Sequence, residues 1–266
     1  MRHYDIASQL QYSSTAYRTK SGLPKGATIA SGGCGPSSVR NLGNNLLGWN
    51  TTIPKVAQIA IDCGARYNGG TTIITLLRAM QRKYGGFDYK YTTNDNTAFS
   101  AVRNGAMCII HTAGAVGGTY NKLLSSAGHF MCLAAVDSSY GYIIDSCSTS
   151  SKWKKLANRQ KYCHLEQSDG LVRVTLPAIR AVIDYYYIVQ PVKKDNKKTQ
   201  PEAVKEKDDD EIMYKTINDV PSWGKQTVQK LLDKKYLTGT ADGVINLTES
   251  MLRMMVINDR AGCYDK

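Results

Sequence analysis

The chain has 266 residues, of which 42% are hydrophobic and 21% charged, and its formal net charge is +12. These values are typical of a folded globular protein and exclude a disordered or fibrous chain. No apolar run approaches the roughly 18 residues that a membrane-spanning helix needs, so we expect no membrane span.

The first part of the chain is predicted to be helical. Residues 1–14 are polar and lack the apolar stretch and cleavage site of a secretory signal, so we expect synthesis in the cytoplasm without a signal peptide. Three segments with apolar residues at helical spacing follow, and Gly48 and Gly85 are placed to end the first and the third. The predicted helices cover residues 36–47, 53–63 and 71–84.

Beyond residue 100 the pattern changes from helices to strands. Short runs rich in β-branched, aromatic or apolar residues alternate with Gly, Ser and Asp turns, which is typical of an antiparallel sheet. Helices followed by such a sheet predict an α+β fold. The predicted strands cover residues 106–111, 129–136, 142–147, 171–176 and 185–189.

Residues 193–211 are densely charged and almost without apolar side chains, which is typical of a flexible linker. The linker separates a larger domain at residues 1–192 from a small module at residues 212–266. The larger domain contains 20 basic and 9 acidic residues, a net charge of +11. Such a surface attracts polyanions, either nucleic acid or the phosphate-rich polymers of a Gram-positive cell wall, unless it only aids solubility. The sequence has no nucleic-acid-binding motif, so we expect no nucleic acid partner.

The small module is predicted to be a helix-loop-helix unit. Pro221 fits the first turn of one helix, Thr248 caps a second, and Gly262 ends it. About 50 residues bury little core alone, so we expect the module to pack on a partner, on another copy or on the larger domain. The two apolar faces are expected to contain Trp223, Thr227, Val228, Leu231 and Leu232, and Met251, Leu252, Met255 and Val256.

Cys34 lies in the segment SGGCGPSSVRN, residues 31–41, where glycines flank a cysteine at the start of a predicted helix. The N–H groups and the positive end of the helix dipole favour a thiolate at this position. The glycines also let a substrate backbone approach and free nearby amides for an oxyanion hole. An arbitrary cysteine is usually a small buried hydrophobe. The context nevertheless makes Cys34 a predicted nucleophile.

A thiolate nucleophile needs a base, and the chain has four histidines. His129 opens an apolar strand after a loop that contains glycine, which predicts a place at the rim of the sheet. His111 ends another apolar strand and is the alternative. His3 and His164 are expected at the surface. We therefore predict that His129 is the base.

A carboxylate on the neighbouring strand would orient the imidazole. Residues 137–141 predict a turn, so the strand after it should run antiparallel to the strand of His129. The even spacing between His129 and Asp145 keeps both side chains on one face of the sheet. Asp137 is the competing carboxylate, but it lies in the turn itself. Asp145 is therefore the predicted third member.

The seven cysteines are an odd number, and none forms a CxxC pair. This pattern argues against a disulfide framework and against a thiolate zinc site. In a reducing compartment most of these cysteines would be free thiols. We expect no metal and no cofactor.

Three sequence blocks resemble those of papain-like cysteine peptidases related to the bacteriocin-leader-processing, or double-glycine, peptidase family. They contain Cys34 in GCGPSS, His129 in GHFMCLAAVD and Asp145 in GYIIDS, in the same order and with similar spacing. The resemblance spans nearly all of residues 1–192. It implies a papain-like fold and thiol chemistry at these three residues.

The same resemblance implies a glutamine upstream of the cysteine that completes the oxyanion hole. The usual spacing falls on Thr28 in this sequence, so the chain departs from the family's pattern here. A longer intervening loop would allow Gln11 to serve, with Gln9 as the second choice. Gln11 is the predicted oxyanion residue.

The tail resembles a single S-layer-homology repeat over residues 219–253, and it is similar to tails of endolysins from phages that infect Gram-positive gut bacteria. Such repeats imply binding to wall polymers. They often occur in sets of three, and one copy is found here. A role in forming homo-oligomers or in docking to the larger domain is therefore the alternative.

These patterns together predict a phage or prophage endolysin that hydrolyses peptide bonds in Gram-positive peptidoglycan. It would be made in the host cytoplasm and act on the wall after release, with peptidoglycan and anionic wall polymers as its partners. Three alternatives stay open. The chain could process a protein or leader peptide, act as an N-acetylmuramoyl-L-alanine amidase with the same triad, or bind the wall without catalysis.

Overall fold

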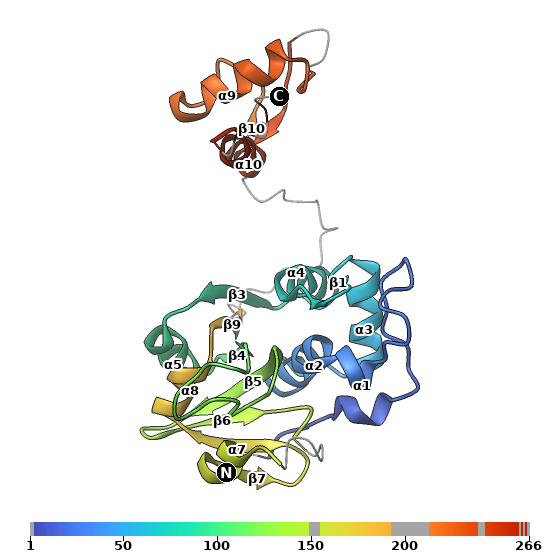
Figure 1. The fold of residues 1–266 in the computed structure, drawn as a ribbon, viewed down its shortest axis with the longest axis vertical. Helices are drawn as coiled ribbons and strands as arrows, with labels where there is room; N and C mark the ends of the chain where they lie inside the picture. Colours follow the sequence, from blue (N-terminus) through green and yellow to red (C-terminus); the bar gives the residue numbers. More distant parts are fainter. Residues whose placement is uncertain are drawn as a thin grey trace, which may run out of the picture. The chain divides into compact units, whose positions relative to one another are not determined.

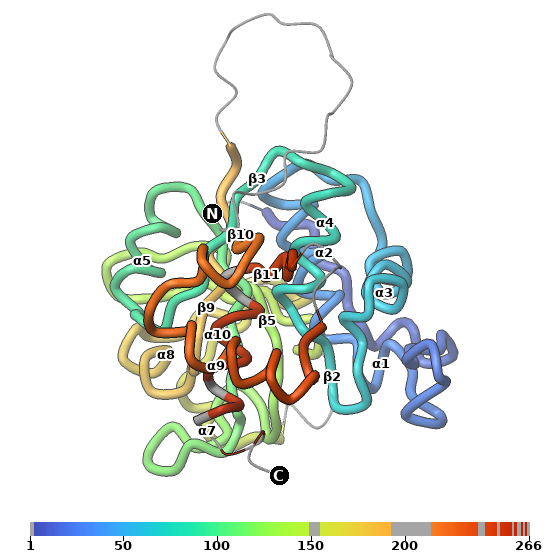
Figure 2. The backbone as a smooth tube through the Cα atoms, turned by 90° about the horizontal axis from the view of Figure 1, so that it is seen from above, coloured from blue at the N-terminus to red at the C-terminus, as the bar shows by residue number. Residues whose placement is uncertain are grey.

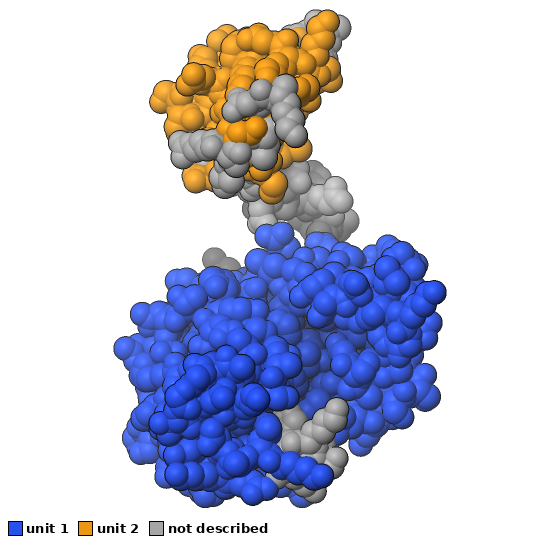
Figure 3. All heavy atoms as spheres, in the orientation of Figure 1, with its two compact units in different colours: residues 1–195 blue, residues 196–266 orange. Residues whose placement is uncertain are grey.

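The computed structural model divides into two compact units, Met1–Asp195 and Asn196–Lys266, which Figure 3 distinguishes by colour. The linker predicted at residues 193–211 lies outside the described residues. The structure describes residues 3–148, 155–192, 213–238 and 243–260, together with residues 262 and 264.

Helices form one layer of the first unit (Figures 1 and 2). The three longer ones begin and end within two residues of their predicted bounds, because buried apolar side chains recur at helical spacing along each. Thr52 caps the second of them, and Gly85 ends the third with a φ of 60°. The layer consists of α1 (Ile29–Gly32), α2 (Cys34–Leu46), α3 (Ile53–Asp62) and α4 (Ile73–Tyr84).

A sheet of seven antiparallel strands forms the second layer, in the order β3-β9-β4-β5-β6-β8-β7. The five predicted strands correspond to β4, β5, β6, β8 and β9. The edge strands β3 and β7 were not predicted, because charged and exposed residues interrupt their apolar pattern. The bounds are β3 Phe87–Thr92, β4 Met107–Thr112, β5 His129–Val136, β6 Tyr140–Ile144, β7 Cys163–Gln167, β8 Leu171–Thr175 and β9 Tyr185–Pro191.

Each face of the sheet has its own hydrophobic core. Cys132 and Ala134 of β5 belong to the core shared with α2, α3 and α4, whereas Met131 and Leu133 belong to the core on the other face. The alternation follows from the period of two along a strand. Shorter helices, not predicted from the sequence, include α5 (Asp95–Arg103) and α8 (Leu176–Val182), which contribute to the second core, and α7 (Ala157–Tyr162). The architecture confirms the predicted α+β class.

The second unit contains the two predicted helices, α9 (Ser222–Asp233) and α10 (Glu249–Arg260). A small antiparallel pair of β10 (Met213–Tyr214) and β11 (Leu247–Thr248) accompanies them. The Thr248 hydroxyl accepts a hydrogen bond from the amide of Met251 at 3.2 Å, as expected of a cap. Trp223 and Met251 are 42% and 51% exposed, so they do not belong to the small hydrophobic core of this unit. No described helix has the length and apolar character needed to cross a membrane.

Candidate active site

Cys34 is the first residue of α2, and Gly33 is the N-cap of that helix. The thiol is half-buried. Backbone amides of Phe130 and Gly35 donate hydrogen bonds to the sulfur, which lies at the positive end of the helix dipole. The nucleophile predicted from the sequence thus occupies a position that stabilises negative charge.

The glycines around Cys34 have a packing role. A Cβ on Gly33 would meet the Ile29 carbonyl oxygen at 2.5 Å, and one on Gly35 would meet the Thr71 Cβ at 2.7 Å. Both distances are shorter than real side chains tolerate. Besides the predicted role in substrate approach, these glycines therefore let α2 begin close against its neighbours.

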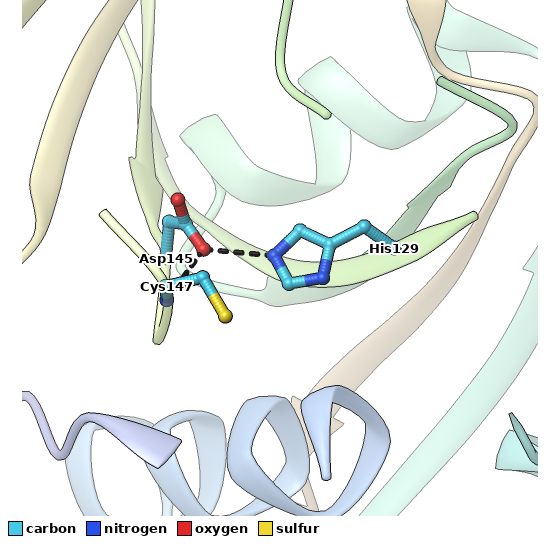
Figure 4. A group of neighbouring side chains, drawn as sticks. All are labelled: His129, Asp145 and Cys147. Carbon is cyan, nitrogen blue, oxygen red and sulfur yellow. Dashed lines mark hydrogen bonds and ion pairs between the residues drawn. The ribbon is translucent and has the colours of Figure 1, made fainter. Parts of the chain in front are cut away.

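His129 and Asp145 form a buried pair beside Cys34. His129 is the first residue of β5, and Asp145 follows the last residue of β6. The imidazole Nε2 lies 2.8 Å from Asp145 Oδ1. Figure 4 draws this interaction as a dashed line between the two side chains. A second hydrogen bond joins the imidazole to the Cys34 thiol. Because Nε2 is engaged with Asp145, Nδ1 is the ring nitrogen that faces the sulfur. The structure therefore brings the three predicted residues together in the predicted order.

The charges of this group support one another. Burial alone would raise the pKa of Cys34. The hydrogen bond and charge of His129 and the amides of Phe130 and Gly35 have a larger, opposite effect, so the pKa of Cys34 is lowered. Burial would also lower the pKa of His129. Hydrogen bonds and charges from Asp145 and Cys34 overcome this effect and raise the pKa of His129 to about 10. Both directions favour a thiolate–imidazolium pair.

Asp145 has further donors that sequence analysis missed. Its Oδ1 accepts from the amide of Cys147 at 2.9 Å, and its Oδ2 lies 3.3 Å from Arg159 Nη2. The side chains of Asp145 and Arg159 are 0% and 9% exposed, so this is a buried ion pair. Arg159 lies on α7 in a basic stretch, which gave no signal that distinguished it from surface arginines and lysines.

The competing candidates have other partners. His111 Nδ1 lies 2.8 Å from Asp184 Oδ2, and its ring stacks on Tyr185. Asp137 accepts from the amides of Ser139 and Tyr140 within the turn, which lowers the pKa of Asp137. Neither residue is joined to Cys34 by a hydrogen bond in the described part of the chain.

The structure does not place Gln11 at the site. Gln11 is exposed and lines a surface depression with Ile6, Ser168 and Asp169. Gln9 is the buried glutamine, because the short helix η1 (Gln9–Tyr12) begins there and turns its side chain inward. Of the two glutamines considered for the oxyanion hole, the second choice, Gln9, is therefore the one whose side chain lies in the interior.

Gln9 links α1 to the residue that follows Asp145. Its Nε2 donates to the Ala30 carbonyl oxygen at 3.0 Å, and its Oε1 accepts from the Ser146 hydroxyl at 2.8 Å. Thr28, at the family's usual spacing, instead caps α1 by accepting from the Ser31 amide. The first residues of the chain thus contact the turn that carries Asp145.

A metal would fit this group poorly. Ligand atoms of His129, Asp145 and Cys147 lie within 4.8 Å of one another. However, the carboxylate of Asp145 is already paired with the guanidinium of Arg159, and that cation would repel a second one. These side chains are better explained as a hydrogen-bond network that orients the imidazole of His129.

No protein-family model matches the chain, and no curated protein matches it. Among solved structures, the chain is similar to the peptidase domain of Streptococcus ComA, a bi-functional ABC transporter involved in a quorum-sensing pathway. The two chains are 15% identical, the match covers 60% of this chain and 91% of that one, and the TM-score is 0.40. A likeness this distant does not assign a function to the chain. The resemblance of residues 219–253 to an S-layer-homology repeat stays a prediction.

Proposed function

We propose that this chain is a cysteine peptidase of the papain-like kind, with Cys34 as its nucleophile. The observation that carries the proposal is the series of hydrogen bonds that runs from the Cys34 thiol, at the N-terminus of α2, through His129 to the buried carboxylate of Asp145. Nucleophile, base and orienting carboxylate in this order form the general arrangement for acyl transfer.

The geometry supports a two-step reaction. The Cys34 thiolate attacks the carbonyl carbon of a peptide bond, and the helix N-terminus stabilises the oxyanion that forms. The His129 imidazolium then gives its proton to the leaving amine as the carbon–nitrogen bond breaks, which leaves a thioester. Neutral His129 next takes a proton from water, which attacks the thioester and releases the acid and the Cys34 thiolate.

Asp145 keeps the imidazole in position during both steps. Its carboxylate holds Nε2, so that Nδ1 faces the sulfur, and its charge stabilises the imidazolium. Burial strengthens this interaction because water does not screen it.

The substrate that we propose is the peptide part of Gram-positive peptidoglycan, so that the chain acts as an endolysin. The net charge of +11 on residues 1–192 supports this choice, since a cationic surface is attracted to an anionic wall. The tail's resemblance to a wall-binding repeat also favours it. The second unit would then hold the chain at the wall.

The test compares the purified full-length chain with its Cys34→Ala variant on Gram-positive walls. We expect the variant to lose lysis, and a Cys63→Ala control, at the end of α3, to keep it. Mass spectrometry of the digest would identify the new terminus and so separate an endopeptidase from an amidase. Lysis by Cys34→Ala at the wild-type rate would refute the mechanism. Cleavage of peptides without any change in wall fragments would retain the peptidase and reject the wall substrate.

A further inference from the structure

Five aromatic rings form a continuous surface across four neighbouring strands. We call them the aromatic platform: Phe130 on β5, His111 on β4, Tyr185 and Tyr187 on β9, and Tyr91 on β3. Ring centroids lie 4.8 Å apart for His111 and Phe130, 4.9 Å for His111 and Tyr185, 5.8 Å for Tyr185 and Tyr187, and 5.5 Å for Tyr187 and Tyr91.

The platform starts at the nucleophile. Phe130 follows His129, and its amide donates to the Cys34 sulfur. Phe130 and Tyr187 also pack against the core that α2 shares with the sheet, so the platform lies on the face where α2 begins. A substrate bound at Cys34 therefore has the Phe130 end of the platform as its neighbour.

The outer part of the platform is open to solvent. Tyr91 is 51% exposed, and Tyr67 is 52% exposed on the hairpin of β1 (Arg66–Tyr67) and β2 (Gly70–Thr71), close enough to Tyr185 for an electrostatic interaction. Tyr186, between the two platform tyrosines of β9, is instead fully buried in the opposite core. Core packing explains Tyr186, but it does not explain Tyr91 and Tyr67, whose rings are about half exposed. Such patches mark binding surfaces.

Polar groups accompany the rings. The Asp184 carboxylate, 35% exposed, is paired with His111, and the tyrosines add hydroxyls. Burial raises the pKa of Tyr185 and of Tyr187, so their hydroxyls stay protonated and can donate. A pyranose ring matches this combination, because it offers C–H groups to an aromatic face and hydroxyls to polar neighbours. An apolar peptide side chain would use the rings alone.

We propose that the aromatic platform is a saccharide-binding subsite that holds the glycan strand next to the stem peptide cleaved at Cys34. This inference rests on the proposed function, and it names the part of the wall that the enzyme recognises besides the peptide. Tyr91 and Tyr187 would be specificity-determining residues.

The first test measures kcat/KM of the full-length chain on a cross-linked muropeptide that carries its disaccharides and on the same peptide without sugar. We expect Tyr91→Ala and Tyr187→Ala to lower kcat/KM roughly three- to tenfold on the sugar-bearing substrate, mainly through KM. Cleavage of the sugar-free peptide should not change. Tyr140→Ala is the matched control, since Tyr140 lies on β6 beside Arg173 and outside the platform. Near-ultraviolet circular dichroism checks the fold of each variant.

Equal losses on both substrates would overturn the inference, because the rings would then bind peptide. No loss on either would overturn it as well. If the wild type cleaves neither substrate, the proposed function has failed, and binding of N-acetylglucosamine tetrasaccharide to the full-length chain decides the inference separately. Weaker binding by Tyr91→Ala than by Tyr140→Ala would support the subsite, and absence of binding by the wild type would refute it.

Discussion

At the scale of single residues, the chemistry depends on two groups that shift each other's pKa. The pKa of Cys34 lies below its usual value, while that of His129 rises to about 10. An enzyme that needs the thiolate and the imidazolium together works between these two pKa values. The hydrogen bond between the two residues therefore predicts the pH range of activity.

We expect a bell-shaped profile of kcat/KM against pH. Activity should rise as the Cys34 thiol loses its proton, below the ordinary thiol range, and fall near pH 10 as the His129 imidazolium loses its proton. Rates with a soluble peptide between pH 4 and 11, together with iodoacetamide labelling of Cys34, would measure both limbs. A thiol that titrates in its ordinary range near 8.5 would contradict this prediction.

Arg159 is the residue whose removal should cost most stability around the site. Arg159→Met leaves Asp145 without one of its partners in a buried place, and losing one member of such a pair costs roughly 3–5 kcal/mol of unfolding free energy. Chemical denaturation measures the change. Arg180→Met is the control, since the Arg180 side chain is 40% exposed and its pair with Asp95 should contribute about 1 kcal/mol or less.

A functional effect should accompany this loss. With Arg159 absent, Asp145 is less firmly held, and we expect kcat to fall roughly tenfold or more with KM nearly unchanged. Arg159→Lys keeps a cation and should recover part of kcat. Unchanged kcat in a folded Arg159→Met variant would show that the imidazole is oriented without this arginine.

At the scale of elements, the close start of α2 requires small residues. Gly35→Ala would place a methyl group 2.7 Å from the Thr71 Cβ on β2, and relieving such overpacking typically costs about 1–3 kcal/mol. Gly32→Ala is the matched control, because its nearest atom would be Nη2 of Arg66 at 3.4 Å, an ordinary contact distance. Thermal unfolding should separate the two variants, and equal Tm values would contradict the packing role of Gly35.

The elements also show which parts of the fold local sequence determines. The helices α2, α3 and α4 and the central strands carry their own apolar periodicity, so their bounds were predicted closely. The edge strands β3 and β7 form because neighbouring strands offer free hydrogen-bonding groups. The sequences of β3 and β7 alone do not indicate strands.

The residues of the candidate site also differ in whether local sequence or tertiary packing places them. Cys34, His129 and Asp145 lie next to local signals: flanking glycines, a strand start and a hairpin spacing. Arg159 reaches Asp145 only through tertiary packing, from α7, and no local pattern distinguishes it. Which of Gln9 and Gln11 is buried also depends on the conformation of η1 and not on a local pattern.

At the scale of the whole molecule, charge should govern approach to the wall. The excess of basic over acidic residues in 1–192 predicts wall binding that weakens as salt rises from about 0.05 to 0.5 M, since the Debye length falls from roughly 14 to 4 Å. Co-sedimentation with purified walls measures the binding. Cleavage of an uncharged soluble peptide should change little over the same range. Binding that does not respond to salt would show that charge is not what attracts the chain.

The contact between Gln9 and Ser146 has a practical consequence for anyone who handles this protein. The Ser8 hydroxyl and the Gln9 amide both donate to the Ser146 carbonyl oxygen, at 2.8 and 3.2 Å, one residue beyond Asp145. The segment of residues 8 and 9 therefore supports the turn that carries Asp145, although it lies far from that turn in sequence. We expect that a purification tag or a reporter fused close to residues 8 and 9 would disturb this turn.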